Sequence, residues 1–218
     1  MEDLPEIIPL FPLPNVVLFP HVDLPLHVFE PRYREMVRDA LDGDRLIGMA
    51  LLRGEWRKDY HASPPIYQLG CVGCIENVSS LPDGRFNLVL HGLRRFEIIE
   101  EIAGKPYRRA RVQWRPDQVA IRGLTPAIEL RLRSSVTRLV ERAHGEVAGD
   151  LWQRLPNEAE KLVNTLAFAL DLSEIEKLAL LECGDLGTRS ERLVEVIEFR
   201  LAERVFGGSD PGGGERRH

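Results

Sequence analysis

The sequence predicts an α+β fold in which a β-rich half precedes a bundle of about four helices. Short apolar or alternating runs, separated by proline and glycine turns, fill the chain up to about residue 116. Beyond that point the apolar residues recur at spacings of three and four, which is typical of helices. The predicted organisation is therefore a β-rich domain over 1–116, a helical bundle over 117–206 and a disordered tail over 207–218.

Composition is that of an ordinary water-soluble domain. The 218 residues are 44% apolar and 29% charged, which is enough for a real core and a solvated surface. The formal net charge is −5, and neither half is basic: 15 Lys and Arg face 16 Asp and Glu up to Pro116, and 14 face 18 beyond it. This balance does not favour a phosphate backbone as the partner.

The opening stretch PLFPLPNVVLFPHVDLPLHVFEPRYREM, from Pro9, threads six prolines through Leu, Val and Phe. Proline lacks a backbone N–H, so this segment is expected to form short extended pieces between turns, with strands at 16–19 and 24–29. Pro31 is well placed to begin a helix, and Gly43 to end it. His27 is expected to be a half-buried packing residue of its strand.

Further strands follow the first helix. They are predicted at 45–53, 66–80, 85–93, 95–102 and 107–114, with a turn at 81–84. Their close spacing is typical of a small barrel or sandwich. In the second half, Pro126 begins a helix whose apolar face is expected to contain Leu130, Val136, Leu139 and Val140. Asn157, Ser173 and Thr188 each precede a Glu by three positions and are predicted N-caps of the next three helices.

Catalytic and metal motifs are missing from the sequence. It contains no G-x-x-x-x-G-K-[ST] phosphate loop, no G-x-S-x-G nucleophile turn and no H-E-x-x-H pair. Cys71 and Cys74 have the spacing of a zinc or redox half-site, but on a strand they point to opposite faces, so we expect two separately packed thiols. We expect no enzyme activity, no cofactor and no metal. With no membrane-span run and no signal peptide, the chain is expected to be cytoplasmic and to make no membrane contact.

The cationic stretch KPYRRARVQWR, residues 105–115, has two interpretations. It could contact a nucleic acid, but its alternation is also that of a half-solvated strand. In the second interpretation the nearby Glu97, Glu100 and Glu101 pair with its arginines.

The sequence resembles the N-terminal substrate-binding domain of Lon-type proteases. The resemblance rests on PLFPLPNVVLFP, on FEPRYR, on YQLGCVGCIENVSSLPDGRFNLVLHGLRRFEI and on LAFALDLSEIEKLALLECGDLGTRSERLVEVIE, and it covers roughly residues 7–206 in order. It implies a PUA-like β-barrel with a helical bundle behind it, and prolines that let the chain wrap the barrel in short edge strands. The ATPase and Ser–Lys protease modules of a full Lon protease are not in this sequence, so the resemblance is to a free-standing domain.

The same resemblance implies a non-catalytic module that recognises polypeptide segments or unfolded proteins. A role in protein quality control and a separate protease as partner belong to this hypothesis. The resemblance places part of the peptide-contacting surface at the first helix, with Glu30, Arg32 and Tyr33 as the candidate residues. Two alternatives stay open: a nucleic-acid-binding PUA-like domain, and a small-molecule-binding protein with a pocket between barrel and bundle.

Overall fold

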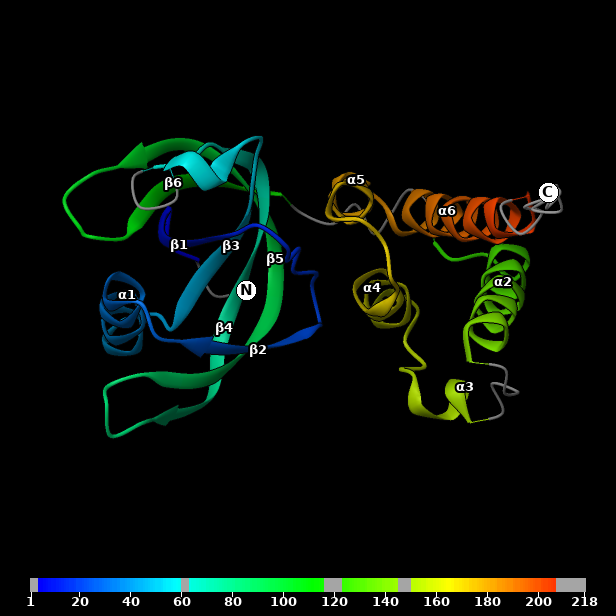
Figure 1. The fold of residues 1–218 in the computed structure, drawn as a ribbon, viewed down its shortest axis with the longest axis horizontal. Helices are drawn as coiled ribbons and strands as arrows, with labels where there is room; N and C mark the ends of the chain where they lie inside the picture. Colours follow the sequence, from blue (N-terminus) through cyan, green and yellow to red (C-terminus); the bar gives the residue numbers. More distant parts are fainter. Residues whose placement is uncertain (1–3, 60–62, 116–122, 145–149, 207–218) are drawn as a thin grey trace, which may run out of the picture.

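The β-rich half precedes the helical half, as the sequence predicts (Figure 1). The computed structural model describes residues 4–59, 63–115, 123–144 and 150–206. The first part contains β1 (Ile7–Leu13), β2 (Asp23–Val28), α1 (Pro31–Asp42), β3 (Leu46–Leu52), a 3₁₀ turn (Trp56–Asp59), β4 (Ile66–Ser80), β5 (Phe86–Ile102) and β6 (Arg108–Arg115). The second contains α2 (Pro126–His144), α3 (Leu151–Arg154), α4 (Ala159–Ala169), α5 (Glu174–Glu182) and α6 (Leu186–Phe206).

The strand pairings close into a ring. The sheet order is β2-β5-β4-β3-β1-β6, and β5 pairs with β6 as well, so five strands join end to end with β2 added outside on β5. The 17-residue β5 makes this possible, since its first half pairs with β2 and its second half with β6 while β4 lies along its other edge. The two strands predicted at 85–93 and 95–102 are thus one continuous strand. A closed ring is what the predicted small barrel requires.

The prolines of the opening stretch do not all lie in edge strands, contrary to expectation. Pro9 and Pro12 lie within β1, which pairs with β6 over residues 7–10 and with β3 over residues 10–13. Each half of β1 thus has a registered partner on one side. The missing N–H of each proline can face the other side, so proline is tolerated there.

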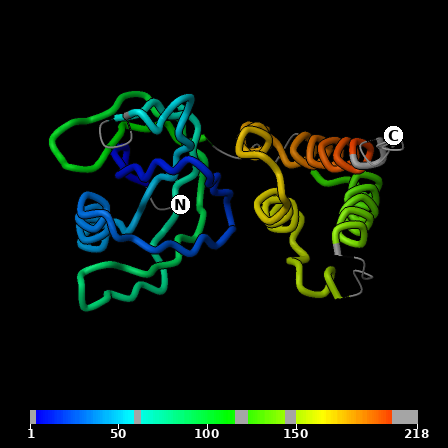
Figure 2. Tube along the Cα trace, in the orientation of Figure 1, coloured from blue at the N-terminus to red at the C-terminus, as the bar shows by residue number. Residues whose placement is uncertain are grey.

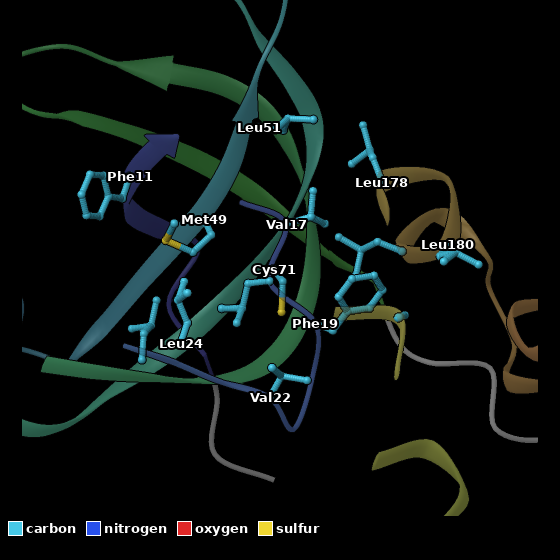
Figure 3. Packing of buried hydrophobic residues seen from close by; sticks show 14 of the residues in the cluster. Phe11, Val17, Phe19, Val22, Leu24, Met49, Leu51, Cys71, Leu178 and Leu180 are labelled. Carbon is cyan, nitrogen blue, oxygen red and sulfur yellow. The ribbon is translucent and has the colours of Figure 1, made fainter. Parts of the chain in front are cut away.

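The predicted strand at 16–19 is wrong. This segment has no strand pairing, yet Val17, Leu18 and Phe19 are buried. It crosses β5 instead: His21 N–H donates to the Gly92 carbonyl at 2.7 Å, and Gly92 N–H donates to the Val22 carbonyl at 2.9 Å. The residues are apolar because helices of the second half cover the segment, and Figure 3 shows Leu178 on the side of α5 that is nearest to it.

Two hydrophobic clusters form the core. The smaller one takes residues from all five strands of the ring and fills its interior: Ile8, Leu10, Leu46, Ala50, Leu52, Ile66, Val72, Phe96, Ile98, Ala110 and Val112. The larger cluster joins the outer face of the sheet, the buried side of α1 and the helical part. A single apolar cluster therefore runs from the sheet into the bundle. Figure 2 shows that, among the helices that follow β6, α4 and α5 lie nearest the sheet.

Buried polar groups also join the two parts. The guanidinium of Arg95 on β5 donates to three carbonyl oxygens at the end of α5, those of Leu181, Cys183 and Gly184. Arg189 on α6 donates to Asn164 Oδ1 at 2.7 Å, and the Asn164 amide donates to the Pro20 carbonyl at 3.0 Å. These bonds tie α4, α5 and α6 to the strand part of the chain.

The helix starts are predicted with mixed success. Ser173 forms the predicted capping box with Glu176. The prediction is wrong at the other two sites: the N-cap of α4 is Glu158, one residue after Asn157, and Thr188 lies inside α6, where its N–H donates to Asp185. A capping residue followed three positions later by Glu therefore does not by itself determine the residue at which a helix begins.

The apolar face of α2 also differs from the prediction. Leu132 and Val136 are buried, whereas Leu130 is 71% exposed. No helix among the described residues is long and apolar enough to cross a membrane. The predicted tail at 207–218 and the predicted domain boundary after residue 116 lie outside the described residues.

Candidate functional site

The three residues predicted to contact a peptide lie together at the start of α1. Arg32 Nε donates to Glu30 at 3.0 Å, and the Arg32 guanidinium lies 4.6 Å from the centre of the Tyr33 ring. Tyr33 is only 4% exposed and packs on Phe11, with the ring centres 4.3 Å apart. The N-cap is Glu30, and its carbonyl accepts the Arg34 N–H, which fixes the entry into the helix.

Arg32 and Tyr33 line a cavity of about 340 Å³, which we call the α1–hairpin cavity. Its walls are Arg32, Tyr33, Ser63 and residues 101–109 of the β5–β6 hairpin. Figure 1 shows α1 flanked by the β5–β6 hairpin on one side and the β4–β5 hairpin on the other. The contribution of residues 101–109 to this site was not predicted, although 105–115 stand out in the sequence as a cationic stretch.

A polar cluster fastens α1 to the β5–β6 hairpin. Asp39 of α1 accepts a hydrogen bond from the Tyr107 hydroxyl at 2.6 Å and lies 2.7 Å from the Lys105 ammonium. The bonds from Lys105 and Tyr107 lower the pKa of Asp39 below its usual value. Burial raises the pKa of Tyr107, and so does the hydrogen bond to Asp39. An ionised Asp39 therefore links α1 to two residues of the cavity wall, Lys105 and Tyr107.

This link predicts an effect of pH. Because the folded-state pKa of Asp39 is lowered, its ionised form stabilises the fold above the ordinary carboxyl pKa of about 3.9. This stabilisation is lost as the pH falls through the lowered folded-state pKa. We expect Asp39→Asn to reduce the urea midpoint at pH 7 and to match the unsubstituted chain more closely at pH 3.

The matched control is Asp42→Asn on the same helix, because Asp42 is exposed. It should leave the urea midpoint unchanged at pH 7. A deficit of Asp39→Asn that is equally large at pH 7 and pH 3 would show that Asp39 does not act through its charge.

The cations around the α1–hairpin cavity differ in how they are compensated. Arg108 is fully engaged: it donates through Nε and Nη2 to the Glu101 carboxylate and through Nη1 to the Pro64 carbonyl. Arg109 is not. Among the described residues, only the Ala103 carbonyl accepts a hydrogen bond from Arg109, at 3.0 Å, and its buried Nε–H has no acceptor.

Farther along β6 the arginines are paired with carboxylates. Arg111 lies 3.0 Å from Glu100 and 2.7 Å from Glu6, and Arg115 pairs with Glu97. The predicted ion pairs of the half-solvated strand are therefore present. Because these cations are already compensated, little free positive charge remains on this strand for a nucleic acid.

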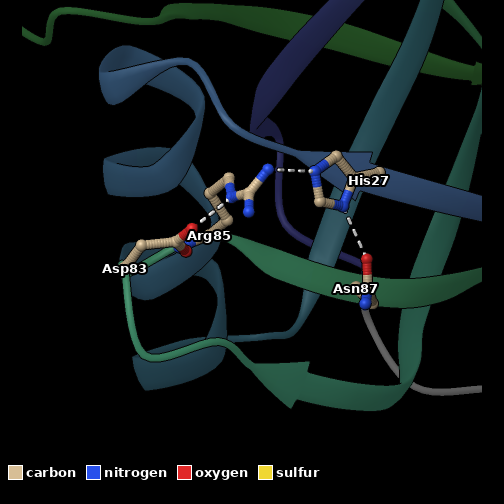
Figure 4. Close-up of polar contacts among 4 residues, drawn as sticks. All are labelled: His27, Asp83, Arg85 and Asn87. Carbon is tan, nitrogen blue, oxygen red and sulfur yellow. Dashed lines mark hydrogen bonds and ion pairs between the residues drawn. The ribbon is translucent and has the colours of Figure 1, made fainter.

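His27 lies on the outer face of the sheet and is exposed, which corrects the prediction of a half-buried residue. Its ring nitrogens contact Asn87 Oδ1 at 2.6 Å and Arg85 Nη1 at 3.3 Å, and Arg85 donates in turn to Asp83 (Figure 4). Odd-numbered residues of β2 face solvent, which explains the difference. The chain of contacts holds the β4–β5 turn against β2.

A second cavity, of about 370 Å³, lies between the sheet and α5. It corresponds in place to the pocket that the small-molecule hypothesis requires. Its charged walls include Arg95, Glu97, Arg115 and Glu182. Arg95 donates to carbonyl oxygens at the end of α5, and Glu97 pairs with Arg115, so these groups serve the fold.

The two cysteines of the C-x-x-C pattern pack separately, as predicted. Cys71 is buried in the larger cluster, whereas Cys74 borders the smaller one inside the ring. Burial raises the pKa of the Cys74 thiol. Within the described residues, no group of three or more His, Cys, Asp or Glu side chains is arranged to hold a metal ion.

Comparison with known proteins places this geometry in a family. Residues 7–198 match the model of the ATP-dependent protease La (LON) substrate-binding domain. Lon protease 2 of Myxococcus xanthus is 28% identical over 207 residues, covering 90% of this chain and 24% of the relative. Lon protease of Dictyoglomus thermophilum is 29% identical, covering 93% of this chain and 25% of the relative. The chain thus spans about a quarter of the length of these curated relatives.

Solved structures agree. A Lon N-terminal domain protein from Xanthomonas campestris superposes with a TM-score of 0.63 at 28% identity, covering 87% of this chain and 97% of that one. The N-terminal domain of a Mycobacterium avium complex Lon protease superposes with the same TM-score, 0.63, at 18% identity, which supports the fold alone.

Proposed function

The chain belongs to the Lon substrate-binding domain family, and we propose from this membership that it is a non-catalytic module that recognises polypeptide segments or unfolded proteins. The proposal includes a cytoplasmic location, a role in protein quality control and a separate protease as a partner. The family description supports substrate recognition.

The observation that carries the proposal is the α1–hairpin cavity at the predicted site. It is open to a ligand, and Arg32 presents a cation beside the aromatic ring of Tyr33. Its volume of about 340 Å³ lies at the lower end of the roughly 300–1,000 Å³ range of small-ligand sites, so it suits one or two side chains of a bound segment. Because only one or two side chains enter the cavity, most residues of the bound polypeptide would not affect recognition.

A binding titration tests the proposal. Fluorescein-labelled α-lactalbumin, reduced and carboxyamidomethylated so that it stays unfolded, is titrated with the full 218-residue chain and followed by anisotropy. We expect saturable binding of the unfolded form and no binding of the native form. No saturation with the unfolded form, by a chain whose circular dichroism confirms its fold, would contradict the proposal.

The same assay locates the site. Arg32→Gln removes the cation at the cavity wall, and we expect it to weaken binding of the unfolded probe roughly tenfold, equivalent to about 1.4 kcal/mol. Arg138→Gln is the matched control because Arg138 is exposed on α2, outside the cavity. Equal losses in the two variants would indicate only a general electrostatic effect.

A further inference from the structure

We propose that the α1–hairpin cavity holds a carboxylate of the bound polypeptide, either an Asp or Glu side chain or the C-terminal carboxylate, and that Arg109 is the residue that binds it. This inference rests on the proposed recognition of polypeptides, and it names the chemical group that is recognised.

The charge balance of the cavity favours an anion. Four cationic side chains line it, Arg32, Lys105, Arg108 and Arg109, against one carboxylate, that of Glu101. These walls belong to a chain whose net charge is −5, so the cavity is a local positive site on an acidic protein. A positive concave site raises the local concentration of anionic groups.

Arg109 is the cation whose charge is least compensated. Arg32 pairs with Glu30, Lys105 with Asp39 and Arg108 with Glu101. Within the part of the chain that the structure describes, Arg109 has no carboxylate within 4.0 Å. It is half-buried, so solvent compensates its charge only in part. A ligand carboxylate would complete the pairing that the other three cations already have.

The hydrogen-bonding capacity of Arg109 points to the same ligand. A guanidinium group has five N–H donors. Here Nη2 donates to the Ala103 carbonyl and the buried Nε–H has no acceptor, so the side chain is partly desolvated without full compensation. A carboxylate at the remaining Nη hydrogens would supply charge-assisted hydrogen bonds, which are the stronger kind.

The fold holds Arg109 in place before a ligand arrives. Its backbone pairs with Pro9 of β1 on one side and with Ile102 of β5 on the other. Gly104, at φ +106°, lies beside the Arg109 side chain, since a Cβ placed there would be 3.6 Å from Arg109 Nη2. A binding group fixed in this way loses little conformational entropy when the ligand binds.

The surroundings favour a single carboxylate over a nucleic acid. A polynucleotide is bound by a continuous track of cations along its phosphates. Along β6 the neighbouring Arg108, Arg111 and Arg115 are occupied by Glu101, Glu100 and Glu97. One cation without a paired carboxylate, in a cavity that is open to a ligand, matches one anionic group.

The test uses the full-length chain and three fluorescein-labelled unfolded peptides of about 15 residues. The first has one central Glu and a C-terminal amide. The second has Gln in place of that Glu and the same amide. The third has Gln and a free C-terminal carboxylate. We expect either carboxylate, or both, to strengthen binding roughly tenfold over the Gln amide peptide at low salt, which identifies the source of the carboxylate.

The deciding variant is Arg109→Gln. We expect it to abolish the preference for a carboxylate, so that all three peptides bind this variant with equal affinity. Arg111→Gln is the matched control: it lies two residues along the same strand but is paired with Glu100 and Glu6, so the preference should persist. Arg109→Lys keeps the positive charge but lacks the planar guanidinium with its several N–H donors, so it should retain only part of the preference for a carboxylate. Circular dichroism must show a native fold for each variant.

The outcomes separate the two proposals. If none of the peptides binds, the proposed recognition of polypeptides fails. If all three bind equally, or if Arg109→Gln keeps the preference, the carboxylate assignment fails while polypeptide recognition stands. If a single-stranded RNA oligonucleotide binds more tightly than the carboxylate peptides and depends on Arg109, the carboxylate assignment is overturned in favour of phosphate.

Discussion

Arg189→Ala is expected to lower the free energy of unfolding by about 3 kcal/mol or more. The substitution removes a buried, hydrogen-bonded guanidinium group and leaves a cavity inside the helical part. Arg189 is 1% exposed, and its guanidinium donates to Asn164 Oδ1, to the Leu180 carbonyl and to the Cys183 carbonyl. Alanine leaves Asn164 Oδ1 without this donor, and a buried group left unsatisfied costs about 1–3 kcal/mol. The Leu180 and Cys183 carbonyls each keep a second donor, from Cys183 N–H and Arg95 Nη1. The substitution also removes a long side chain from a packed interior.

Urea denaturation followed by circular dichroism measures this loss. Arg192→Ala is the matched control, because Arg192 is exposed on the same helix and should change the free energy of unfolding by less than about 0.5 kcal/mol. Arg189→Met refills most of the volume but restores no hydrogen bond, so it should fall between the two. If Arg189→Ala and Arg192→Ala are equally stable, the buried hydrogen-bond network does not stabilise the fold.

Gly92→Ala is expected to be comparably severe, for a steric reason. A Cβ at Gly92 would lie 2.0 Å from the Phe19 carbonyl oxygen and 2.9 Å from the Phe19 carbonyl carbon, so backbone would have to move. The two hydrogen bonds that link residues 21 and 22 to Gly92 fix that backbone. We expect a loss at or above the upper end of the about 1–3 kcal/mol that overpacking costs.

Thermal and urea unfolding of the purified variant test this expectation. Gly123→Ala is the control, since no atom lies within 4 Å of a Cβ placed at Gly123. The control should match or slightly exceed the stability of the unsubstituted chain, because alanine restricts the unfolded state. A Gly92→Ala protein as stable as Gly123→Ala would mean that the segment before β2 does not press against β5.

Local patterns predicted those parts of the fold that depend on local interactions. The apolar period and Pro31 correctly predicted α1, and Ser173 with Glu176 correctly predicted the start of α5. Each signal lies within a few residues of the structure that it specifies. The prediction at 16–19 was wrong because the apolar residues there are buried by contact with β5 and α5, far away in the sequence, and extended strands and buried crossings have the same composition.

The candidate site was predicted only in part, for the same reason. The resemblance placed Glu30, Arg32 and Tyr33 at α1, but the rest of the cavity comes from residues 101–109, which reach it through the pairing of β5 with β6. Arg109 looked like one of several arginines on a cationic strand. What sets it apart is a missing carboxylate neighbour, and a missing neighbour becomes visible only when the register of the strands is known.

The ring of strand pairings has a consequence for a protein proposed to meet unfolded chains. Closure leaves β2, among the described strands, as the one paired on a single side. Its middle contains Pro25, which has no N–H to offer an incoming strand, and it begins at the charged, exposed Asp23. The free edge of β2 is therefore poorly suited to pair with an incoming strand. A bound unfolded chain would be held through side-chain contacts and would not add a strand to the sheet, which limits co-aggregation.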